Sequence, residues 1–212
     1  MMRASKILAV SAMALLACRC SNNATSSAPP PDTAARPPSA STSEVIGTGP
    51  RGAGFPSIIV LDPQTPREFP APTQPGVMDQ QGLAFIPSLL LVRQGQPVMF
   101  RNSEDVLHNV RVGESGTSQP VFNVATVPGN AYTHTFTQPG FYSVSCDVHE
   151  SMHADIFVTS TPYAVVAAAD GTFKFSDVPA GSYKLTVYLG PRRIERVVTI
   201  AGTRTQLTVN ED

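Results

Sequence analysis

The sequence contains no tryptophan, few cysteines and little charge. Only 15% of its 212 residues are charged, and 15 Lys and Arg against 16 Asp and Glu give a formal net charge of -1. Because no basic stripe exists, nucleic acid is not expected as a partner. No long amphipathic period occurs, whereas 20 Pro and 15 Gly indicate short strands joined by turns.

The first residues have the features of an export signal. A basic start precedes the apolar run Ile7–Ala17, which is too short to be a permanent membrane span. The segment Leu15–Cys18 resembles the lipobox of bacterial lipoproteins, in which cleavage before the cysteine leaves its thiol to be acylated. We predict that residues 1–17 are removed and that Cys18 is a lipid anchor. The protein would then lie on a membrane of the bacterial cell envelope, in the periplasm or on the outer surface. An ordinary signal with an incidental cysteine is the alternative.

A flexible linker is predicted over residues 18–48. Most of it is Ser, Ala, Thr and Pro, which cannot bury enough surface to fold. Of the three cysteines only Cys146 lies in a part that looks folded. A lone thiol in an oxidising compartment needs an occupant, which is either a metal ion or a bridge from Cys20.

Two blocks of strands follow the linker. Between residues 78 and 159, turn residues separate short apolar segments whose spacing favours a sandwich. Residues 160–212 alternate between apolar and polar positions and predict a small antiparallel sandwich, near the lower limit for an independent core. The segment 49–77 contains the apolar run Ile58–Leu61. This run could begin the first sandwich or pair with the C-terminal one, and we favour the second placement because the C-terminal block is short of strands.

The residues that carry chemistry lie at the end of one predicted strand. Cys146 ends the strand Phe141–Cys146, and His149 and Met152 follow at intervals of three, so one tight loop offers a thiolate, an imidazole and a thioether. His108 is the candidate for a further imidazole. Two imidazoles, one thiolate and a weak axial thioether are the ligands of a blue-copper electron-transfer site, whereas zinc prefers a regular tetrahedron. His153 is an alternative metal ligand, which the pattern favours less than the other four residues.

The order of these motifs resembles the plastocyanin, pseudoazurin and amicyanin group of cupredoxins. The resemblance covers residues 78–159 and includes Val98–Asn102, Leu107–Val110 and Pro139–Tyr142, and the Cys146 loop has a spacing similar to that of amicyanin. It implies one copper ion held by His108, Cys146, His149 and Met152, with the side chain of Asn109 bracing the loop. The surface around the copper site is expected to be more polar than is usual in the family, because it carries Glu150, Ser151 and His153.

The C-terminal block is similar to carboxypeptidase regulatory-like domains. Asp170–Phe173, Val178–Gly181 and Tyr183–Leu185 carry this likeness, which implies a passive transthyretin-like module. The expected fold class is therefore all-β, with a Greek-key cupredoxin sandwich and a small transthyretin-like antiparallel sandwich.

Three functions compete. The favoured one is a copper protein that carries electrons between redox protein partners in the envelope, and is not an enzyme. A copper-binding or copper-delivery protein is the second, and a non-redox interaction module is the third. A thiol nucleophile is disfavoured because Cys146 and His149 lack a third orienting group.

Overall fold

The computed structural model describes residues 41–51, 55–117 and 119–211, and all regular elements among them are strands. The predicted all-β class is confirmed. The signal at 1–17, the Cys18 anchor and the linker up to residue 40 lie outside the described residues. None of the described residues belongs to a helix long and apolar enough to cross a membrane.

One sandwich, here called the inserted sandwich, occupies residues 76–159. Its larger sheet has the order β5-β11-β10-β7-β8 and its smaller sheet the order β4-β3-β6-β9. The strands are β3 (Gly76–Gln80), β4 (Phe85–Ile86), β5 (Leu89–Arg93), β6 (Pro97–Asn102), β7 (His108–Glu114), β8 (Pro120–Thr126), β9 (Ala131–Thr135), β10 (Gly140–Ser145) and β11 (His153–Thr159).

The core of the inserted sandwich comes from inward positions that alternate along its strands. In β6 the inward residues are Val98, Phe100 and Asn102, all fully buried. Two of them are apolar, and the third is an amide at the strand end. The buried side chains of this sandwich therefore change from apolar to polar at the end of β6.

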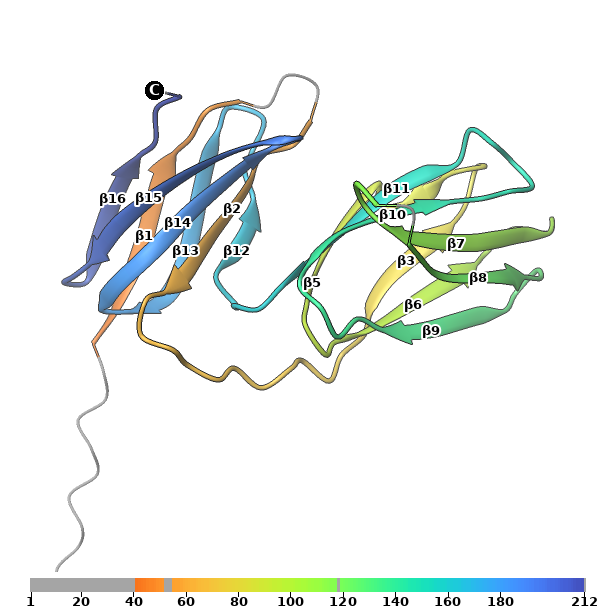
Figure 1. The fold of residues 1–212 in the computed structure, drawn as a ribbon, viewed down its shortest axis with the longest axis horizontal. Coiled ribbons are helices and arrows are strands. Elements are labelled where there is room, and N and C mark those ends of the chain that lie inside the picture. The colour runs from red at the N-terminus through yellow and green to blue at the C-terminus, as the bar shows by residue number, and fades with distance from the viewer. Residues whose placement is uncertain (1–40, 52–54, 118, 212) are drawn as a thin grey trace, which may run out of the picture. The chain divides into compact units, whose positions relative to one another are not determined.

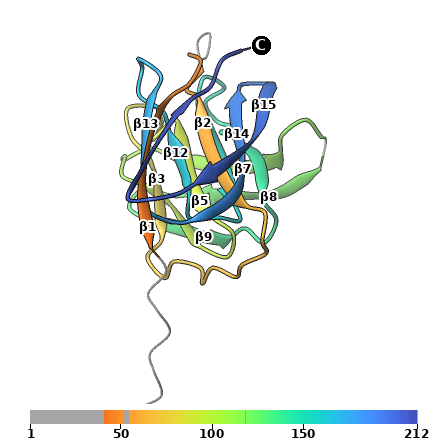
Figure 2. The ribbon, with the colours of Figure 1, turned by 90° about the vertical axis from the view of Figure 1, so that its left-hand side faces the viewer.

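The second sandwich, here called the split sandwich, is made of two separate stretches of chain. Its sheets have the orders β13-β1-β16 and β12-β2-β14-β15. Figures 1 and 2 show β1, in orange, beside β13 and β16 from the far end of the sequence. The strands are β1 (Thr42–Thr48), β2 (Ile58–Pro63), β12 (Ala164–Val166), β13 (Thr172–Pro179), β14 (Gly181–Leu189), β15 (Arg192–Ile200) and β16 (Arg204–Thr208).

The predicted end of the linker is wrong. The linker predicted over 18–48 ends too late, because Thr42–Thr48 is the central strand of the three-stranded sheet and Val45 is fully buried. The block 160–212 is completed by two strands from outside its bounds, of which β2 agrees with the favoured placement of Ile58–Leu61 and β1 was not expected. The short polar stretch around Val45 is held as a strand by pairing with β13 and β16 near the other end of the sequence, so the local sequence does not reveal it.

The run Ile58–Leu61 pairs with strands of the C-terminal block. Antiparallel ladders join β2 to β12 and to β14. All four side chains are buried, because Ile59 and Leu61 lie in the core of the split sandwich while Ile58 and Val60 pack with Phe157 of β11. Burial on both faces explains why this strand is continuously apolar instead of alternating. The inserted sandwich is thus an insertion between β2 and β12.

Candidate metal centre

His108 is the first residue of β7 and is fully buried. Its side chain lies on the same strand face as Val110 and Val112, which belong to the apolar core. The imidazole therefore closes one end of that core.

Cys146 follows β10, on the strand face that also carries Tyr142 and Val144. The chain then forms a tight loop closed by two backbone hydrogen bonds. The Met152 N–H donates to the His149 carbonyl (3.0 Å), and the Cys146 N–H donates to the Met152 carbonyl (3.2 Å). This closure turns His149 back toward the thiol.

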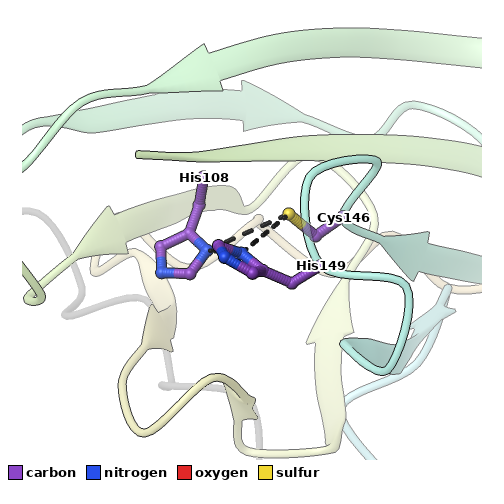
Figure 3. Close-up of side chains that lie close together, drawn as sticks. All are labelled: His108, Cys146 and His149. Carbon is purple, nitrogen blue, oxygen red and sulfur yellow. Dashed lines mark hydrogen bonds between the residues drawn. The ribbon is translucent and has the colours of Figure 1, made fainter. Parts of the chain in front are cut away.

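The side chains of His108, Cys146 and His149 converge, as Figure 3 shows. The two Nδ1 atoms are 3.0 Å apart, and Cys146 Sγ is 3.9 Å from His108 Nδ1 and 4.0 Å from His149 Nδ1. Two donors can share an ion only if their separation is below the sum of two metal–ligand bonds, which is roughly 4.1–4.3 Å for nitrogen and sulfur donors. All three separations meet this limit, so the set fits one ion.

The far side of the His108 ring contacts an acidic side chain that the sequence analysis missed. His108 Nε2 lies 2.6 Å from Glu104 Oε2. The hydrogen bond with His108 holds the pKa of Glu104 below its usual value of 4.5. A carboxylate at this position makes Nε2 the protonated nitrogen and leaves the lone pair on Nδ1. The only signal in the sequence is an acidic residue four positions before a histidine, which is too common to single out.

Asn109 contacts the loop that begins at Cys146. Its Oδ1 accepts a hydrogen bond from the Asp147 N–H (2.6 Å) and lies 3.3 Å from Cys146 Sγ. Its Nδ2 donates to Asn123 Oδ1 (2.7 Å) and Asp147 Oδ2 (3.0 Å). The side chain therefore ties β7 and β8 to the loop that carries the thiol.

The other candidate residues differ in where they lie. Met152 is fully buried and belongs to the same apolar cluster as Cys146. His153 is exposed at the start of β11 and is not among the three converging donors. The remaining histidine, His134, was not a candidate ligand, and its ring contacts those of Phe122 and Phe136, with centroids 4.7 and 4.8 Å away, while burial lowers its pKa.

These features define a class of protein, namely a two-sheet β-sandwich with a His-Cys-His metal site at one end, in which His108 and Cys146 are buried and His149 is partly exposed. Residues 73–159 match the family model "Copper binding proteins, plastocyanin/azurin family". The chain belongs to this family, whose members bind copper.

Plant plastocyanins are among the proteins to which this chain is similar. The chain is 31% identical over 81 residues to the plastocyanin of Solanum crispum, an alignment that covers 34% of this chain and 82% of that protein. It is 32% identical over 77 residues to the chloroplastic plastocyanin of Silene latifolia subsp. alba, covering 32% of this chain and 47% of that one. A solved structure of an oxidized amicyanin mutant is 25% identical, with a TM-score of 0.37, and the match covers 40% of this chain and 82% of that one.

Proposed function

We propose that this protein is a one-electron carrier with a single copper ion, and not an enzyme. The convergence of two imidazoles and one thiol within 4.8 Å at the end of a packed sandwich is the observation that carries the proposal. The Nδ1 atoms of His108 and His149 and the Sγ of Cys146 would hold the ion, and the thioether of Met152, buried in the same apolar cluster as Cys146, would be a weaker ligand. Copper bound in this way supplies reversible one-electron chemistry.

The protein's own contribution is a site that stays fixed when the charge changes. His108 and Cys146 are buried, and the hydrogen bonds of Asn109 and of the closed loop hold the donors from both sides. A rigid donor set needs little rearrangement between the two oxidation states, which favours fast electron exchange over copper release.

His149 is the ligand through which electrons would enter and leave. It is partly exposed, whereas His108 and Cys146 are buried. Apolar side chains next to the ligands are exposed as well, with Leu107 at 48% beside His108 and Val148 at 52% beside His149. The surface around the copper site therefore also has an apolar part. The sequence-based prediction of a more polar surface missed this part, because it rested on Glu150, Ser151 and His153 alone. We propose that the redox partner docks here.

The remaining parts of the proposal concern location and the second sandwich. We propose that Cys18 is acylated and holds the protein on a bacterial envelope membrane, facing the periplasm or the outside, where redox proteins are its partners. The motif Leu15–Cys18 supports this. We also propose that the split sandwich is a carboxypeptidase regulatory-like module without a catalytic role, on the motifs Asp170–Phe173 and Val178–Gly181.

Copper loading and redox titration test the function. The full chain should bind one equivalent of Cu(II) with an intense visible band from the thiolate, lose the band on uptake of one electron per copper, and regain it on oxidation. Cys146→Ser should remove the band, while Ser143→Ala, an exposed position on the same strand, should keep it. Copper that leaves the protein on reduction would favour delivery instead, and a colourless Cu(II) complex would contradict the electron carrier.

A further inference from the structure

Both carboxylate oxygens of Glu104 face hydrogen-bond donors. Oε2 lies against His108 Nε2, and Oε1 accepts the backbone N–H groups of Gly82 (2.7 Å) and Leu83 (3.2 Å). Glutamine could keep the contacts with the two backbone N–H groups only by turning its NH2 group toward His108 Nε2, which would then have to accept and force the other tautomer. The position is therefore built for an ionised carboxylate.

A buried amide fixes the loop that carries Glu104. The Oδ1 of Asn102, a fully buried residue, accepts the Glu104 N–H (3.0 Å). Its Nδ2 donates to the carbonyls of Val106 and Thr126, each at 2.8 Å. Glu104 is thus not a surface side chain that happens to reach a histidine, since its backbone is tied into the polar end of the inserted sandwich.

From this geometry we infer that Glu104 is a positioning residue that sets the tautomer of His108 and makes the site prefer Cu(II) over Cu(I). The inference rests on the proposed copper site. A carboxylate that accepts the Nε2–H raises the basicity of the ligating nitrogen. Its negative charge also lies directly behind a ring that is fully buried, while 17% of the Glu104 side chain is exposed, and it stabilises the more highly charged ion more strongly. The carboxylate therefore lowers the reduction potential of the bound copper.

Affinities for the two oxidation states test this inference. Glu104→Gln should weaken Cu(II) binding by about 10–100-fold and Cu(I) binding by less. We expect the ratio of the Cu(II) affinity to the Cu(I) affinity to fall about tenfold. For one electron this corresponds to about 59 mV, so the reduction potential of the bound copper should rise by about 59 mV. Asp105→Asn is the matched control, because it removes the same charge from the next residue, which is exposed and makes no hydrogen bond or ion pair among the described residues. It should shift the ratio much less.

The copper-free wild-type chain gives a second readout that does not depend on how the variant folds. The 15N shifts of its imidazoles should show His108 protonated at Nε2. Protonation at Nδ1 would overturn the inference, as would a Cu(II)/Cu(I) ratio that changes no more in Glu104→Gln than in Asp105→Asn. These results leave the electron-carrier proposal standing, whereas a wild-type protein without a copper–thiolate band would overturn both.

Discussion

The two sandwiches contain the same kind of corner, stabilised by a tyrosine hydroxyl. They differ in the residues that the tyrosine's own strand carries further along. Tyr142 in the inserted sandwich donates its hydroxyl hydrogen to the Gln138 carbonyl (2.9 Å), and Tyr183 in the split sandwich donates to the Pro179 carbonyl (2.8 Å). In each case the acceptor lies four residues earlier, which is the pattern of a tyrosine corner. A glycine with positive φ precedes each tyrosine by two positions, Gly140 at 148° and Gly181 at 156°.

The position four residues after each tyrosine shows how the sandwiches differ. It is Cys146 in the inserted sandwich and Val187 in the split sandwich, and both side chains are buried. The first strand ends there and opens into the ligand loop, whereas β14 continues to Leu189 and turns into β15. The shared corner orients a strand, but the chemistry depends on the residue at its end.

A truncated side chain in the core of the split sandwich tests whether the copper site depends on that sandwich. Leu185 is almost fully buried in its core, and Leu185→Ala should lower the free energy of unfolding by about 2–5 kcal/mol. Copper affinity of the folded protein should be unchanged, because Leu185 and the ligands belong to different apolar clusters. Denaturant unfolding and Cu(II) titration measure the two effects. A tenfold loss of copper affinity would show that the two sandwiches are coupled.

Removing the brace of the ligand loop should weaken the metal site specifically. Asn109→Ala deletes the acceptor of the Asp147 N–H, and copper affinity should fall by about 10–100-fold. Asn123→Ala is the control, because it removes a neighbour of Asn109 and Asp147 but leaves that acceptor in place. Competition with a chelator measures both affinities, and equal losses would argue against a special role for Asn109.

The corner hydrogen bonds should contribute alike in the two sandwiches. Tyr142→Phe and Tyr183→Phe each remove one donor from a carbonyl, so each should lower the free energy of unfolding by about 0.5–1.5 kcal/mol. Denaturant melts of the two variants check this. A large effect at only one corner would mean that the two tyrosines are not equivalent.

Two aspartates should give opposite stability effects at neutral pH. Burial raises the pKa of Asp79, but hydrogen bonds from Arg101 and Ser103 outweigh it and hold the pKa below 3.8. The ionised form therefore stabilises the fold above pH about 4, and Asp79→Asn should lower the free energy of unfolding by about 1 kcal/mol there. This difference should disappear as the pH falls through the lowered pKa.

Burial is the main influence on Asp62 in β2, and it raises the pKa above 3.8. Ionisation then disfavours the fold once the pH exceeds the raised pKa, so Asp62→Asn should give a small gain in stability at neutral pH. The gain should shrink as the pH falls toward 3.8. Unfolding free energies of both variants between pH 3 and 7 test the signs, and effects of the same sign at neutral pH would contradict the account.

The strand and the loop that carry Cys146 and His149 could be predicted from the sequence, because their pattern lies within one short segment. Alternation along Phe141–Cys146 and the spacing of His149 are visible in one short segment. The strand Thr42–Thr48 was missed because its partners lie more than 100 residues away. Glu104 was missed because its role depends on the amides of Gly82 and Leu83, which only the folded chain brings to it.

X-ray absorption at the copper edge tests the central claim most directly. With one equivalent of copper bound to the full chain, the account predicts a first shell with one short sulfur contact and two nitrogens in both oxidation states. The sulfur contact should vanish in Cys146→Ser. A shell of nitrogen and oxygen alone in the wild-type protein would contradict the account, because the thiol of Cys146 would then not be a ligand.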